Sequence, residues 1–281
     1  VVQDGARIVK TGVGDATIHT DLAVYGTFDV EGGRVLPQRV NSGSLVDTGT
    51  WNVSDGASVQ FDVNHYINGA SFTGTGDVIS TSDLVMEGSS TIGPGVELTI
   101  LGGTLVTNGT PGISLDGASS SCTTCQVRLE ADGTDPSIGA VTIGQGLTVT
   151  QVSDSYGSTG DTTTLDGTWN IEGAGVDLRD SLSGFAIGST GRLTIDCGTN
   201  ATTCIVDPQV FTNAGSIEVT RGIVQVGALG NLVGGTLTNG TYQVSGGAKL
   251  DLPETIVSNA ATIVQDGNGS RIRVTSGGAQ A

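Results

Sequence analysis

A five-residue pattern recurs along the chain: glycine, a hydroxyl residue, a large apolar residue, a polar residue and an aliphatic one. The copies lie at 26–30, 49–53, 167–171, 215–219 and 240–244. Because side chains alternate between the two faces of a strand, the third and fifth residues of each copy share a face. The pattern therefore predicts short strands with an apolar inner face, on which Trp51 and Trp169 lie.

The spacing of these copies indicates how the strands are organised. Gly26 and Gly49 are 23 residues apart, and Gly215 and Gly240 are 25 residues apart. Copies are followed by further glycines, which supply the positive φ of a sharp corner, and then by a second alternating strand. We expect an all-β fold, a single-stranded right-handed parallel β-helix (β-solenoid) of roughly 12 coils of about 23–25 residues. Its right-handedness is taken from known solenoids.

Composition agrees with strands and turns. The chain has 46 glycines, two lysines and one methionine, whereas its abundant β-branched residues disfavour helices. Two alternatives compete with the solenoid: a β-sandwich or jelly roll, which also has many short strands, and disorder. Apolar residues make up 36% of the chain and recur in alternating runs, which argues against disorder.

The repeat extends over most of the chain. We expect residues 1–281 to form one continuous solenoid with loop insertions near 118–138 and 153–164. A flexible tail is expected at 275–281. No run of 18 apolar residues interrupts the pattern, so no membrane span is predicted.

The net charge of −17 excludes one class of partner. Nucleic-acid binding requires clustered lysine and arginine, and the chain has 11 of these residues in total. An acidic surface either is simply solvated or collects cations.

Four cysteines form two pairs that are close in sequence. Cys122 and Cys125 enclose two residues, and Cys197 and Cys204 enclose six. Two local disulfides, each holding a loop, are the simplest interpretation, with free thiols or a zinc site as alternatives. Disulfides indicate an oxidising compartment, so we expect an extracellular or cell-surface protein.

The glycine- and threonine-rich coils at 211–226 and 235–250, and more weakly at 11–36, carry a resemblance. They resemble the coils of secreted bacterial β-helix proteins, namely filamentous-haemagglutinin-type adhesins and autotransporter passengers. The resemblance implies the fold and an extracellular location, and it brings no catalytic residue with it.

Candidate chemistry is sparse. Asp132, Asp135, Asp154 and Asp161 lie in acidic loops that could bind calcium, although aspartate in such turns more often caps its own backbone. His19 and His65 have no nearby nucleophile pattern, and His65 is expected at the surface or in a turn. No catalytic residue is assigned, and no cofactor is expected other than calcium.

We therefore expect a non-enzymatic extracellular structural or adhesive β-solenoid, either a filament subunit or a segment of a large surface adhesin. The alternative is a carbohydrate-binding or carbohydrate-cleaving β-helix similar to a tailspike. Expected partners are other copies, through end-to-end stacking of coils, or host and cell-surface glycans. The repetition of residues 2–5 (Val-Gln-Asp-Gly) at 264–267 is consistent with stacking of the two ends.

Overall fold

The computed structural model describes residues 1–38, 45–107, 114–119, 122, 124–131, 136–139, 141–157, 162–179 and 184–274. These residues form strands and turns, and the strands pair in parallel to build a β-solenoid of about 11 turns. The predicted fold class is confirmed. Within this part of the chain there is no helix long and apolar enough to cross a membrane.

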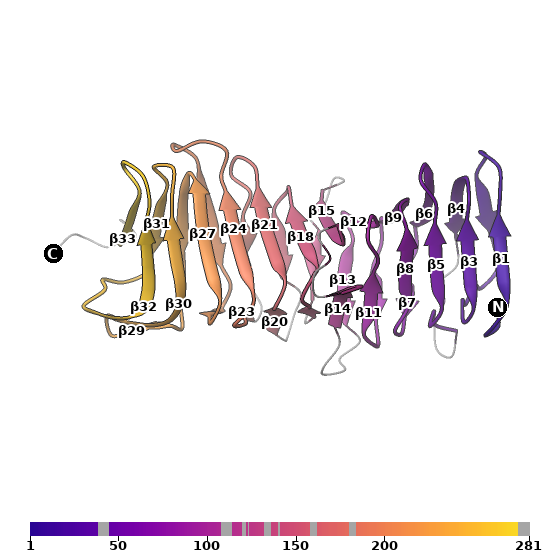
Figure 1. Ribbon diagram of the computed structural model, residues 1–281, viewed down its shortest axis with the longest axis horizontal. Helices are drawn as coiled ribbons and strands as arrows, with labels where there is room; N and C mark the ends of the chain where they lie inside the picture. Colours follow the sequence, from indigo (N-terminus) through magenta and orange to yellow (C-terminus); the bar gives the residue numbers. More distant parts are fainter. Residues whose placement is uncertain are drawn as a thin grey trace. The chain divides into compact units, whose positions relative to one another are not determined.

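The chain divides into two compact units, Val1–Val149 and Thr150–Ala281, and strand β18 (Thr148–Gln151) contains the division. In each unit the strands belong to three sheets, which we call first, second and third in the order in which a turn visits them. Figure 1 shows the strands of each unit stacked side by side.

In unit 1 the strands are as follows. The first sheet has β1 (Arg7–Lys10), β3 (Thr27–Val30), β5 (Thr50–Val53), β8 (Ser71–Gly74), β11 (Ser90–Ile92), β14 (Ser114–Gly117) and β17 (Thr142–Ile143). The second sheet has β2 (Ala16–Ile18), β4 (Gly33–Pro37), β6 (Ala57–Phe61), β9 (Asp77–Ser80), β12 (Glu97–Leu101) and β15 (Gln126–Glu130). The third has β7 (His65–Ile67), β10 (Leu84–Met86), β13 (Thr104–Thr107) and β16 (Ser137–Ile138).

Unit 2 repeats this order. Its first sheet has β20 (Thr162–Leu165), β23 (Gly184–Ile187) and β26 (Val210–Asn213). The second has β21 (Thr168–Glu172), β24 (Arg192–Asp196), β27 (Ser216–Arg221), β29 (Leu232–Val233), β30 (Thr236–Val244) and β32 (Ser258–Gln265). The third has β19 (Ser155–Gly157), β22 (Leu178–Arg179), β25 (Thr203–Asp207), β28 (Ile223–Val226), β31 (Lys249–Leu252) and β33 (Arg271–Val274). Among the described strands of this unit, β29 and β30 pair antiparallel.

The inner face of each unit is a set of apolar columns. In unit 1, Phe28, Trp51 and Phe72 occupy one register position on successive strands, and Trp51 stacks on Phe28 with ring centroids 4.9 Å apart. In unit 2, Trp169 meets Phe185 edge-on at 5.2 Å. Both tryptophans are fully buried, as the alternation of the recurring pattern predicted. Burial of such large apolar side chains stabilises the turns that contain them.

Two kinds of glycine make the corners. Gly33 has a φ of 66°, the left-handed conformation that the sequence predicted for a sharp corner. Gly49, the first residue of the recurring pattern, is needed for a different reason. A Cβ there would collide with the carbonyl oxygen of Gly26 on the previous turn. At Gly49 the pattern therefore begins with glycine because the backbone of the previous turn leaves no room for a Cβ.

Outward-facing side chains of neighbouring turns bond to one another. The Asn52 amide donates to Asp29 at 2.6 Å, and the Thr73 hydroxyl donates to the Asn52 oxygen at 3.2 Å. The Arg7 guanidinium pairs with Asp29 from the other side. Burial opposes the charged form of Asp29, but the bonds from Arg7 and Asn52 outweigh it, so the pKa of Asp29 lies below its usual value. Such ladders tie each turn to the next.

The length of a turn varies more than the sequence suggested. Paired positions are 20 residues apart from Ser71 to Thr91 but 29 apart from Glu97 to Gln126. The strands keep their register while the loops between them change length, because a longer loop costs little extra entropy. This is why the expected 23–25 residues describe only some turns.

Candidate functional site

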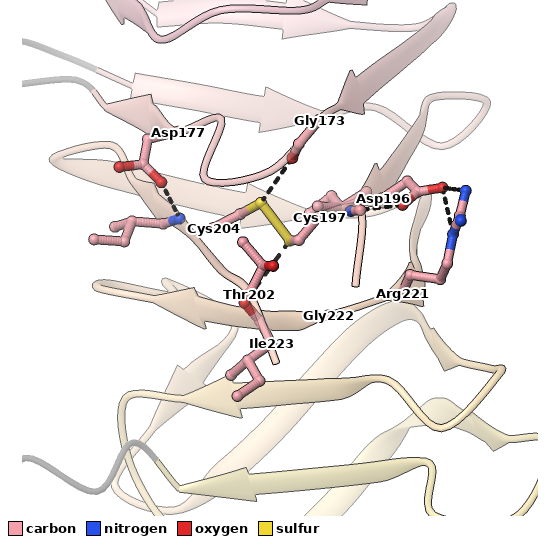
Figure 2. Close-up of a disulfide and its surroundings, with 12 residues drawn as sticks. Gly173, Asp177, Asp196, Cys197, Thr202, Cys204, Arg221, Gly222 and Ile223 are labelled. Carbon is pink, nitrogen blue, oxygen red and sulfur yellow. Dashed lines mark hydrogen bonds and ion pairs between the residues drawn. A yellow bond between two sulfur atoms is a disulfide. The ribbon is translucent and has the colours of Figure 1, made fainter. Parts of the chain in front are cut away.

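Both predicted cysteine pairs form disulfides. The Cα atoms of Cys122 and Cys125 are 5.8 Å apart, and those of Cys197 and Cys204 are 5.9 Å apart. Cys197 and Cys204 are fully buried, so this disulfide lies inside the solenoid although it closes a loop. Cys204 lies in β25 at the same register position as Val224 and Leu250, so its sulfur belongs to the apolar interior (Figure 2).

The loop closed by Cys197 and Cys204 also contacts later turns. The Asn200 side chain accepts a hydrogen bond from the Gly222 N–H at 3.1 Å and donates to the Gly246 carbonyl at 3.0 Å. The disulfide therefore fixes a loop whose tip joins the corners of two following turns.

Of the four calcium candidates, Asp132, Asp135 and Asp161 lie outside the described residues. Asp154 is described, and its carboxylate accepts the backbone N–H of Asp177 at 2.9 Å. This contact joins two turns 23 residues apart in sequence, so it is not the local capping of its own backbone that such aspartates often make. Within the described ranges no three histidine, cysteine, aspartate or glutamate side chains come together as a metal site. Calcium binding stays a prediction.

His65 is not at the surface, so that expectation was wrong. It is fully buried in β7, and its Nε2 lies 2.6 Å from Oδ2 of Asp47, which is buried as well. The same carboxylate accepts the indole N–H of Trp51 at 2.8 Å and, through Oδ1, the backbone N–H of Val24 at 2.8 Å. The ring of Phe61 stacks on His65 at 4.2 Å.

This buried cluster of Asp47, Trp51 and His65 links neighbouring turns inside the core. Its polar atoms bond to one another instead of facing a cleft, so the carboxylate holds two turns together. The signal for His65 was present in the sequence, because alternation places it on the same face as Ile67. Its partner Asp47 gives no local signal, because it lies 18 residues earlier.

The first turn of unit 1 leaves part of the apolar column open. Ile8 in β1 pairs with Phe28 and so occupies an inward position, yet it is 42% exposed, whereas Phe28 is 4% exposed. In β2, Ala16 and Ile18 are only half-buried, although Val35, the residue opposite Ala16, is fully buried. No described strand covers the outer edge of either strand.

The last turn of unit 2 is open in the same way. β32 pairs with β30, and no other described strand lies against it. Its eight residues, Ser-Asn-Ala-Ala-Thr-Ile-Val-Gln, contain no charge and no proline. Ile263 is half-buried over the fully buried Tyr242. In β33, Ile272 is half-buried over Leu250.

Comparison with known proteins identifies no relative. No family model matches the chain, and neither a curated protein nor a solved structure does. The function must therefore be argued from the described geometry, in which no described strand pairs with the outer edges of the first and last turns.

Proposed function

We propose that the chain is a non-catalytic structural subunit of an extracellular β-solenoid assembly, in which copies associate head to tail through their end turns. The observation that carries the proposal is the edge of β32 (Ser258–Gln265), eight residues long and uncharged. Soluble proteins usually protect exposed strand edges with charges, proline or a covering segment, because an open edge recruits another strand.

The partner that fits this edge is the first turn of a second copy. Residues 261–263 of β32 and residues 16–18 of β2 have the same sequence, Ala-Thr-Ile. Both strands belong to the second sheet of their unit. In both, the alanine and the isoleucine are half-buried and the threonine is exposed. A parallel in-register pair would therefore place like side chains on like, as the pairing of β3 with β5 already does.

A charge close to the N-terminal edge does not oppose this pairing. Lys10 occupies an inward position opposite Val30. Its ammonium group donates to the carbonyl oxygens of Gly12 at 2.7 Å and Gly32 at 2.6 Å. The charge is thus bonded to a corner of its own chain. Because the contact joins two different surfaces, association of this kind is open-ended and gives filaments.

The disulfides support the compartment that we propose. Two disulfides in one chain are typical of an oxidising environment, which supports an extracellular or cell-surface location. The outward side chains support a structural role, because many of them form hydrogen bonds and ion pairs with side chains of the neighbouring turn.

The proposal is tested by measuring molar mass against concentration by analytical ultracentrifugation. We expect the wild-type chain to associate as its concentration rises. Ile263→Lys and Ile18→Lys place a charge at the two edges and should reduce association at least tenfold. Val13→Lys is the matched control, because Val13 is 96% exposed in the turn between β1 and β2.

Two results would overturn the proposal. One is a wild-type chain that stays monomeric at every concentration, which would instead favour a segment of a larger surface adhesin. The other is an equal loss of association in Val13→Lys, which would show that charge anywhere near the end is responsible.

A further inference from the structure

A second feature, independent of the open ends, lies on the outer face of the second sheet of unit 2. A cleft of about 400 Å³ is formed there by β21, β24 and β27. Its polar lining comes from Asn170, Glu172, Thr194, Asp196, Thr220 and Arg221. The volume lies within the range of about 300–1,000 Å³ that is usual for small-molecule sites.

The strand register places these residues side by side. Asn170 is opposite Thr194, and Glu172 is opposite Asp196. On the next strand, Asp196 is opposite Arg221, because the register shifts by one residue at Thr220. A β-bulge of this kind changes the direction of a side chain, and bulges are over-represented beside functional sites. Here the bulge brings both Thr220 and Arg221 to the cleft.

One wall of the cleft is held rigidly. The Arg221 Nε donates to the Asp196 carboxylate at 2.9 Å, and the other oxygen of that carboxylate accepts the Gly198 N–H at 2.8 Å. The next residue after Asp196 is Cys197, which the disulfide fixes to Cys204 (Figure 2). The carboxylate and the guanidinium are thus positioned before any ligand binds, which lowers the entropic cost of binding.

The floor of the cleft differs from the ladders elsewhere in the molecule. Among the described residues, the amide of Asn170, the carboxylate of Glu172 and the hydroxyl of Thr194 have no hydrogen-bond or ion-pair partner. One strand further along, Glu218 is paired with Arg192. In unit 1, Asp29, Asn52 and Thr73 bond to one another. Three adjacent polar groups are therefore available to a ligand at this place.

We propose that the cleft binds a neutral saccharide unit. Sugar hydroxyls can donate to the Glu172 carboxylate and accept from the Asn170 amide and the Thr194 hydroxyl, which matches the available groups. Asp196 and Arg221 balance each other, so Glu172 leaves the cleft with a net negative charge. That charge disfavours sulfated or carboxylated glycans.

The lining also limits affinity. No aromatic side chain belongs to it, so the stacking contact that strengthens many ligand sites is missing from the described cleft. We expect a dissociation constant of roughly 1 mM for a single tetrasaccharide. An assembly that repeats the site would bind a long glycan much more tightly, because linked sites act together.

The test is a saturation-transfer-difference NMR titration. The probes are neutral tetrasaccharides of glucose, galactose, mannose and N-acetylglucosamine, with a tetrasaccharide of galacturonic acid as the anionic probe. At least one neutral probe should bind. Glu172→Ala should weaken it about tenfold or more and Asn170→Ala about threefold, because bonds to a charged group are the stronger ones.

Gln126→Ala is the control, because Gln126 faces outward on the second sheet of unit 1. Thermal unfolding of each variant verifies that it folds. Binding that survives in both cleft variants, the absence of binding by every neutral probe, or preferential binding of the galacturonic acid probe would each overturn the proposal.

Discussion

Asp47 shows how much can depend on one carboxylate inside a solenoid. It is fully buried and accepts three hydrogen bonds, from Val24, Trp51 and His65. Val24 lies in the turn before Asp47, and Trp51 and His65 lie in the turn after it. The carboxylate therefore joins neighbouring turns through the interior, whereas the ladders join them on the surface. A buried donor that loses its acceptor pays its full desolvation cost.

Asp47→Ala should therefore lower the free energy of unfolding by about 3–5 kcal/mol, as is usual when one partner of a buried polar pair is removed. Asp55→Ala is the control, because Asp55 is exposed in a turn and should cost no more than about 0.5 kcal/mol. Urea unfolding measures both. An equal fall in the free energy of unfolding of the two variants would mean that the buried cluster does not contribute to stability.

Tyr242 predicts a dependence of stability on alkaline pH. Burial raises its pKa to about 12, from an ordinary value of about 10. Between these values the unfolded chain has lost the phenolic proton and the folded chain still holds it. The free energy of unfolding therefore falls as pH rises from about 10 to 12.

Tyr242→Phe should remove this contribution. The fall in stability between pH 10 and pH 12 should become smaller by about 1–3 kcal/mol, while stability at pH 7 changes little. Thermal unfolding at each pH measures the difference. Identical pH profiles for the variant and the wild-type chain would contradict the assignment.

At the scale of strands and loops, prediction from sequence succeeded where the signal was local. The residues 49–53 predicted a strand with Trp51 and Val53 inward, and β5 has this form. Alternation is a property of the strand itself, so neighbouring residues reveal it. The contacts of Asn200 with Gly222 and Gly246 were not predictable, because they join residues of different turns whose spacing varies.

For the candidate sites too, features with a local sequence signal were predictable and features that depend on contacts between turns were not. The open edges could be anticipated, since any solenoid has a first and a last turn. The cleft could not be predicted from the sequence, because it depends on a one-residue register shift at Thr220. No residue type at that point indicates a β-bulge.

The Cys197–Cys204 loop carries a prediction at this scale. Replacing both cysteines by alanine should lower the free energy of unfolding by about 2–3 kcal/mol, from the loop-closure entropy of a short loop. Replacing Cys122 and Cys125 should cost less, because that loop is shorter and Cys122 is not buried. Urea unfolding of the two double variants compares them, and the reverse order would contradict this account.

At the scale of the whole molecule, the apolar columns reach the first and last turns, where no described strand covers them. Among the described residues, Trp51 and Trp169 in the middle turns are fully buried, whereas Ile8 in the first turn is 42% exposed and Ile263 in the last is only half-buried. A second copy would restore coverage at both places at once. The assembly would then be stabilised by the same contacts that stabilise each turn.

Electron microscopy of the purified chain at several concentrations tests this claim most directly, with Ile263→Lys added as a minor component. That variant keeps a normal N-terminal edge, so it can join a growing end but cannot accept the next copy. We predict uniform filaments of the wild-type chain that become shorter as the variant is added, and that are unchanged by Val13→Lys. Dispersed single molecules at every concentration, or filaments whose length does not respond to Ile263→Lys, would contradict head-to-tail stacking of the end turns.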